Sequence, residues 1–158
     1  TAIIQHITYD LLDDEYKTDI FTDATIKGKL GVNAIKTNKH LYDHVVYDSN
    51  VEKTLAENLD TSSDVAVYVK LPSGFFISTP VGKYNPDWAI AFYEDHVKHI
   101  YFVAETKGDL ASLELTHTSS LEKAKIDCAR QHFKAISNGN VIYDVVDSYQ
   151  SLLDKVMK

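Results

Sequence analysis

The chain has 158 residues and a formal net charge of −7, with 44% hydrophobic and 25% charged residues. This length suits one ordinary domain with a core of its own, and the composition is that of a soluble globular protein. No run of eighteen apolar residues occurs, which excludes a membrane-spanning helix. Cys128 is the only cysteine, which excludes a disulfide framework and fits a reducing cytoplasm.

The first part of the chain carries no recognisable functional motif. Apolar residues recur at helical spacing within residues 2–16, although a strand is an alternative there. Residues 17–39 are polar and interrupted by glycines, which favours a short helix with loops. We therefore predict a helical lead-in over residues 1–39 and a separate domain over residues 40–158.

The following stretch alternates between predicted helix and strand. Residues 40–47 mix apolar and polar positions, so a strand and the end of a helix are both open. Ser49 and Glu52 have the spacing of a capping box, which predicts a helix that begins there. Alternating valines predict a strand over residues 64–71, and a short strand is expected over residues 75–78.

The last third of the chain continues this alternation. Ser119 and Glu122 form a second capping-box pattern, which predicts a helix to about Ile136. A strand rich in β-branched residues is expected over residues 141–146, and a final helix ends at Met157. The order of elements predicts an α/β or α+β fold with one sheet covered on both faces.

Two long strands, over residues 87–93 and 99–107, are predicted to form an antiparallel hairpin. With the turn centred on His96, Asp87 lies opposite Glu105, because each is nine positions from the centre. Directly opposed residues in an antiparallel pair share a face of the sheet. The hairpin therefore predicts that these two carboxylates lie together.

Lys107 joins this pair, because residues two apart on a strand point to the same face. The other face carries an apolar layer, which fixes the register against a one-residue slip. The predicted pairs of that layer are Trp88 with Ala104, Ile90 with Phe102, and Phe92 with Ile100. The pattern thus predicts a rigid site that contains Asp87, Glu105 and Lys107.

These residue types suit the hydrolysis of a phosphodiester bond assisted by Mg²⁺. Mg²⁺ prefers hard oxygen ligands, which Asp87, Glu105 and the backbone carbonyl of Thr106 would supply. The metal polarises the phosphate and lowers the pKa of a bound water, while Lys107 orients that water, helps to deprotonate it or neutralises developing charge. The alternative is a simple surface ion cluster, but the apolar residues 102–104 place Glu105 at the end of a buried strand.

The residues around these positions resemble a known family. The segments YNPDWAI (residues 84–90) and YFVAETKG (residues 101–108) resemble the C-terminal endonuclease domain of the restriction (Res) subunit of type III restriction-modification enzymes, a member of the PD-(D/E)xK nuclease superfamily. The segment TPVG (residues 79–82) and the helix over residues 125–133 are similar to the same family. The resemblance covers about residues 40–155.

The resemblance implies a restriction-endonuclease-like α/β core, in which a mixed β-sheet is flanked by helices on both faces. It implies that Asp87 and Glu105 bind Mg²⁺, for which Mn²⁺ can substitute, and that Lys107 is the catalytic lysine. It also implies a bacterial cytoplasmic enzyme that cuts double-stranded DNA. In that enzyme a helicase-like, ATP-using region precedes this domain, and a separate methyltransferase subunit reads the DNA sequence. Partners that hold the DNA would account for the acidic charge of this chain.

Two further residues are candidates for the site, and two rival functions are open. Glu52 corresponds to helix glutamates of related nucleases, although its place in a capping box gives it a structural role. Lys125 follows the site strand and could meet a phosphate, whereas a solvated helix lysine is the alternative.

The rival functions are a non-catalytic docking module of nuclease fold and a nuclease that acts on another DNA structure. The chain begins with Thr1 rather than Met, which we interpret as a fragment of a longer protein.

Overall fold

The computed structural model describes residues 28–108 and 117–158 of the chain. The helix predicted over residues 2–16 lies outside the described residues. In chain order the elements are β1 (Ala34–Lys36), β2 (His44–Val46), α2 (Asn50–Thr61), β3 (Val65–Lys70), β4 (Ile77–Thr79), β5 (Gly82–Tyr84), β6 (Trp88–Phe92), β7 (Tyr101–Thr106), α3 (His117–Ile136), β8 (Val141–Val146) and α4 (Tyr149–Val156). None of the described helices is long and apolar enough to cross a membrane.

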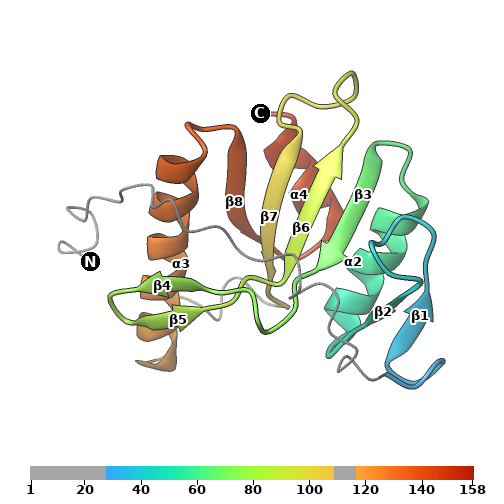
Figure 1. Cartoon of the computed structure of the whole chain (residues 1–158), viewed down its shortest axis with the longest axis horizontal. Coiled ribbons are helices and arrows are strands. Elements are labelled where there is room, and N and C mark those ends of the chain that lie inside the picture. The colour runs from blue at the N-terminus through green and yellow to red at the C-terminus, as the bar shows by residue number, and fades with distance from the viewer. Residues whose placement is uncertain (1–27, 109–116) are drawn as a thin grey trace.

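The centre of the described fold is a mixed sheet with the strand order β3-β6-β7-β8 (Figure 1). Strands β3 and β7 both run antiparallel to β6, whereas β7 and β8 are parallel. Helix α3 connects the two parallel strands and covers one face of the sheet, and α2 and α4 pack on the other face. This arrangement confirms the predicted α/β fold, with a mixed sheet flanked by helices on both faces.

Alternation along the central strands divides the core into two layers. Trp88 and Phe102 are fully buried against α2 and α4, in the same cluster as Leu55 of α2. Val103, the next residue along β7, faces the opposite way and packs against Phe133 of α3. Burial on both faces makes the ends of β6 and β7 rigid points of the molecule.

The register predicted for the β6–β7 hairpin is confirmed. The observed pairs are Trp88 with Ala104, Ile90 with Phe102 and, through a backbone hydrogen bond of 2.9 Å, Phe92 with Ile100. All but the last of these six residues are buried. A slip by one position would turn this whole apolar set toward the other face, so the core itself holds the register.

Helix α2 begins where the capping pattern predicted. The Ser49 hydroxyl accepts a hydrogen bond of 3.2 Å from the backbone N–H of Glu52. The returning bond differs from the prediction, because the Glu52 carboxylate accepts from the N–H of Asp48 at 2.7 Å rather than from that of Ser49. Glu52 therefore reaches one residue further back than a capping box requires.

Helix α3 begins earlier than predicted. It starts at His117, so the predicted cap Ser119 lies within the helix. The side chain of Glu122 binds Lys107 of the neighbouring strand end. This ion pair to another element was not part of the capping pattern predicted from the sequence.

Two short hairpins flank the main sheet. The strand β1 pairs with β2, so the described part of residues 17–39 contains a strand where we predicted a short helix and loops. Gly28 allows this hairpin to close, because a Cβ there would lie only 2.6 Å from Val46 Cγ2. The predicted division between residues 39 and 40 falls within the hairpin. The other hairpin, β4 with β5, lies against the lower end of α3 in Figure 1, and its second strand was not predicted.

Candidate active site

Asp87, Glu105 and Lys107 gather at one end of the main sheet, where β6 begins and β7 ends (Figure 1). Asp87 directly precedes β6, Glu105 lies within β7, and Lys107 is the first residue after it. Asp87 is half-buried and Glu105 is only 6% exposed, whereas the Lys107 side chain is 25% exposed. The structure therefore brings the three predicted residues to one sheet end, with the carboxylates mostly buried and the amine open to solvent.

The carboxylate of Asp87 is held by the neighbouring strand. Its Oδ2 accepts hydrogen bonds from the backbone N–H of Thr106 at 2.7 Å and from the Thr106 hydroxyl at 2.5 Å. Side chains alternate along a strand, so those of Thr106 and Glu105 point to opposite faces. The Asp87 carboxylate thus reaches across the end of β7. The direct pairing predicted for Asp87 and Glu105 is not formed, because the pairing ends at Trp88 with Ala104 and the N–H of Asp87 donates to the Ala104 carbonyl at 3.1 Å.

The backbone of Thr106 is turned toward the same carboxylate. Its N–H donates to a side chain rather than to a backbone carbonyl, so the β6–β7 ladder stops at Ala104. Pro86, which precedes Asp87, has no N–H with which to extend that ladder. The N–H and C=O of one strand residue point to the same edge, so the Thr106 carbonyl also faces the Asp87 side. This orientation suits the predicted role of that carbonyl as a ligand.

Glu105 is held from two sides. The Tyr84 hydroxyl donates to Oε2 at 2.8 Å, and the Lys107 amine lies 3.0 Å from Oε1. Burial and the negative charge of Asp87 raise the pKa of Glu105 to about 7, although the contacts with Tyr84 and Lys107 lower it. A buried carboxylate beside a second carboxylate is an arrangement that a bound cation would stabilise.

The other two predicted residues carry opposite charges. Burial raises the pKa of Asp87, and the hydrogen bonds from Thr106 lower it in part. Burial would lower the pKa of Lys107, but the contacts with Glu122 and Glu105 outweigh it and raise that pKa. Lys107 is therefore a cation at neutral pH, suited to neutralise negative charge and to donate hydrogen bonds.

The donor set can be tested against a metal ion. The described ranges, 28–108 and 117–158, contain no group of three or more histidine, cysteine or acidic residues placed to hold a metal. Asp87 and Glu105 offer two carboxylates, which is what Mg²⁺ commonly takes before waters and substrate oxygens complete its shell. A structural zinc site would need four nitrogen, sulfur or carboxylate ligands. The residues present therefore fit Mg²⁺ or Mn²⁺.

Glu52 reaches the same sheet end through Lys70, a residue that the sequence analysis missed. The Lys70 amine lies 2.7 Å from Glu52 Oε2 and 2.8 Å from Asp48 Oδ2. The pKa of Asp87 depends most on burial and on the hydrogen bonds from Thr106. The charge of Glu52 also raises this pKa and the charge of Lys70 lowers it, so both charges act on the Asp87 carboxylate. The sequence pattern did not point to Lys70, because the alternating valines place it on the opposite face, and only the register shift between Val65 and Val67 brings Tyr68 and Lys70 to the face of Val65.

Lys125 lies on α3 beside the β4–β5 hairpin. A Cβ built on Gly82 would be 3.9 Å from the Lys125 amine, so the lysine borders the turn of that hairpin. The structure gives it no contact with Asp87 or Glu105, and its role at the site stays a prediction.

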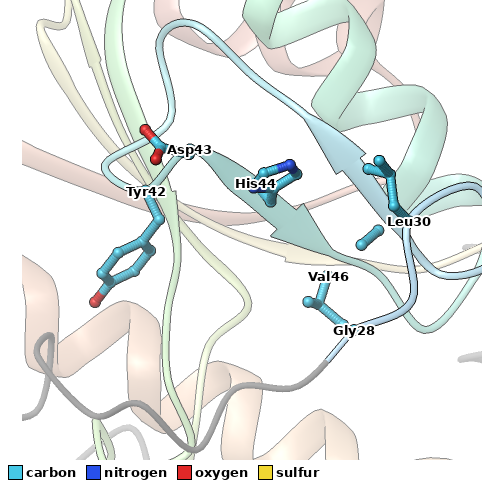
Figure 2. A pocket seen from close by; sticks show the side chains of 7 residues that line it. Gly28, Leu30, Tyr42, Asp43, His44 and Val46 are labelled. Atoms are coloured by element: carbon cyan, nitrogen blue, oxygen red, sulfur yellow. The ribbon is translucent and has the colours of Figure 1, made fainter.

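The pockets among the described residues lie away from the three predicted residues. One, of about 460 Å³, is formed around the β1–β2 hairpin, and Figure 2 shows the side chains that line it, including Tyr42, Asp43 and His44. A smaller one, of about 160 Å³, includes Asp48 and Lys70 and so borders the Glu52 side of the sheet end. Asp87, Glu105 and Lys107 line neither pocket.

The mixed sheet with its flanking helices is consistent with the restriction-endonuclease-like fold. The family model described as "Endonuclease domain" matches residues 38–149, a range that includes Asp87, Glu105 and Lys107. The chain therefore belongs to this family of endonuclease domains. No curated protein and no solved structure gave a match.

Proposed function

We propose that the chain is a Mg²⁺-dependent endonuclease domain that hydrolyses phosphodiester bonds of double-stranded DNA. One observation carries this proposal: the sheet end joins the carboxylates of Asp87 and Glu105 to a lysine whose amine lies 3.0 Å from Glu105. Membership of an endonuclease family supports the reaction class. The substrate and the metal rest on the chemistry of the residues and on the resemblance of the two central motifs.

Each residue has a distinct role in the proposed reaction. Asp87, Glu105 and the carbonyl of Thr106 would hold Mg²⁺. The bound ion would polarise the scissile phosphate and lower the pKa of a water. Lys107 donates hydrogen bonds to that water and neutralises the charge that accumulates on the phosphate. The water oxygen would bond to phosphorus while the bond from phosphorus to the sugar oxygen breaks. The water gives up one proton to solvent, and the sugar oxygen that leaves takes up one proton.

The wider assignment is to the restriction subunit of a bacterial type III enzyme. The segments YNPDWAI and YFVAETKG support it. In such an enzyme an ATP-using, helicase-like region of the same polypeptide and a methyltransferase subunit would be the partners, in the cytoplasm. The net charge of −7 supports these partners, because a chain with more acidic than basic residues has little attraction of its own for the DNA backbone.

Nicking of supercoiled plasmid in Mg²⁺ or Mn²⁺ tests the proposal, with EDTA as the metal control. We expect nicking by the wild-type chain and a loss of at least about 100-fold in Lys107→Ala, as for other lost electrostatic catalysts. Lys53→Ala is the matched control, because Lys53 is a helix lysine whose side chain is 40% exposed and lies 3.9 Å from Glu57. Equal nicking by Lys107→Ala and wild type would contradict the proposed site. If the chain alone does not nick, the same variants are compared in the complete restriction enzyme.

A further inference from the structure

Tyr84 connects the β4–β5 hairpin to the site. It is the last residue of β5, it is buried, and it pairs with the buried Ile77 of β4. Its hydroxyl donates to Glu105 Oε2 at 2.8 Å, across 21 positions of sequence. The hairpin packs on α3 and thereby delivers one hydroxyl to one site carboxylate.

A second buried tyrosine gives this hydrogen bond its direction. The Tyr143 hydroxyl, from β8, is hydrogen-bonded to the Tyr84 hydroxyl. Each hydroxyl has one proton, whereas an ionised carboxylate has none. Because Tyr84 donates its proton to Glu105, Tyr143 must donate to Tyr84. The chain of bonds therefore runs from Tyr143 through Tyr84 to Glu105, and each bond strengthens the next.

The two tyrosine rings are fixed in place. The Tyr143 ring stacks on Phe133 of α3 with a centroid distance of 5.5 Å and an interplanar angle of 11°. It meets the Tyr84 ring edge-on, at 6.1 Å and 84°. Both tyrosines are only 6% exposed. The donor that reaches Glu105 therefore has a set position.

Each oxygen of the Glu105 carboxylate has a different donor. Lys107 contacts Oε1 through a flexible amine, which can follow the carboxylate if it rotates. Tyr84 contacts Oε2 from a packed ring and cannot follow such a rotation. The tyrosine thus fixes the plane of the carboxylate. Partners of this kind behind metal ligands are worth about 10-fold to 100-fold in metal affinity.

We infer that Tyr84 is a positioning residue that orients the Glu105 carboxylate for Mg²⁺, with Tyr143 as its support. The inference rests on the proposed function, because it gives Glu105 a metal to bind. Tyr84 lies three positions before Asp87 in the YNPDWAI segment. One short segment therefore supplies one ligand and the group that orients the other.

Mn²⁺ binding to the whole chain, measured by titration calorimetry, tests the inference. The variants are Tyr84→Phe, Tyr143→Phe and the control Tyr68→Phe. Tyr68 is a buried tyrosine on the opposite face of the sheet, with its hydroxyl 3.4 Å from an Asp60 carboxylate oxygen. We expect Tyr84→Phe to weaken Mn²⁺ binding about 10-fold to 100-fold, Tyr143→Phe to weaken it less, and Tyr68→Phe to leave it unchanged.

The outcomes separate orientation from folding. Unchanged Mn²⁺ affinity in Tyr84→Phe overturns the inference, and so does an equal loss in Tyr68→Phe, which would show general loosening. If Tyr84→Phe does not fold, wild-type affinity in Tyr143→Phe overturns the supporting chain of bonds. A wild-type chain that binds no Mn²⁺ overturns both the proposed metal site and this inference. If the wild-type chain binds Mn²⁺ and Tyr84→Phe binds it equally well, only the role of Tyr84 is overturned.

Discussion

The Lys107 amine lies 2.5 Å from Glu122 Oε1, which ties the end of β7 to helix α3. The same amine lies 3.0 Å from Glu105 Oε1, so two carboxylates share one lysine. Their surroundings differ, because the Glu122 side chain is 41% exposed and that of Glu105 is 8% exposed. An exposed ion pair contributes little to stability, whereas a buried carboxylate depends on its partners.

We expect only one of these two carboxylates to be required for activity. In Glu105→Gln the proposed metal loses a charged ligand, so plasmid nicking and Mn²⁺ binding should both be lost. In Glu122→Gln the metal ligands remain, so nicking should stay within about tenfold of wild type and the free energy of unfolding should fall by less than about 1 kcal/mol. Nicking assays and calorimetry on the two variants measure this difference. Loss of Mn²⁺ binding in Glu122→Gln would place Glu122 among the ligands instead.

The raised pKa of Glu105 predicts that metal affinity depends on pH. A metal ligand must be deprotonated, and the pKa of Glu105 is about 7 in the metal-free chain. At pH 6 only about one tenth of the molecules carry the ionised carboxylate, so the Mn²⁺ affinity should be about tenfold weaker at pH 6 than at pH 8. Calorimetry in buffers of different ionisation enthalpy should detect about one proton released per ion at pH 6 and almost none at pH 8. Equal affinities at both pH values would contradict the assignment.

The same carboxylate should weaken the metal-free fold as the pH rises. The folded-state pKa of Glu105 is raised from 4.5 to about 7, so between these values the folded chain retains a proton that the unfolded chain has lost. Stability is therefore full below about pH 4.5 and falls as the pH rises to about 7. At about 1.4 kcal/mol per pKa unit, the loss is up to about 3 kcal/mol.

Urea unfolding of the metal-free chain at pH 5 and pH 8 measures this loss. The Glu105→Gln variant has no carboxylate to ionise at this position, so it should lose less stability than wild type over that interval. Glu57→Gln is the control, because Glu57 is an exposed helix residue. A wild-type loss no larger than that of Glu105→Gln would show that Glu105 ionises freely in the fold.

The central hairpin could be predicted from the sequence because one of its faces carries large apolar side chains and the other carries the charged residues at its end. Trp88 and Phe102 must be buried together, and this requirement alone selects the register that the structure shows. The register then places Asp87 and Glu105 at the same sheet end. The endonuclease family supports the function class that these residues suggested.

The parts that sequence reasoning missed depend on contacts between distant segments. Tyr84 meets Glu105 only because a hairpin of two three-residue strands packs on α3, and such short polar strands give almost no periodic signal. The start of α3 was predicted two residues too late, because the capping-box spacing of Ser119 and Glu122 also occurs inside a helix. Lys70 was missed because the register shift between Val65 and Val67, which turns Lys70 toward Glu52, cannot be recognised in the alternation of the valines.

The pairing of Lys70 with Glu52 yields the last prediction, which concerns stability. The two side chains are 18% and 11% exposed, with 2.7 Å between the amine and Oε2. Lys70→Met would leave the Glu52 carboxylate poorly solvated, so it should cost about 3 kcal/mol of unfolding free energy. The control Lys53→Met breaks an exposed pair of 3.9 Å and should cost less than about 0.5 kcal/mol.

Adding Glu52→Gln to Lys70→Met isolates the cause of that loss. The cost of the single variant comes from one uncompensated charge, so the neutral double variant should recover most of the lost stability in urea unfolding. Packing lost with the lysine stem would give the opposite result, because removing the glutamate charge would then restore nothing. A double variant as unstable as Lys70→Met would thus show that Lys70 stabilises this sheet end by the packing of its side chain. The ion pairs of Lys70 with Glu52 and Asp48 would then contribute little to the free energy of unfolding.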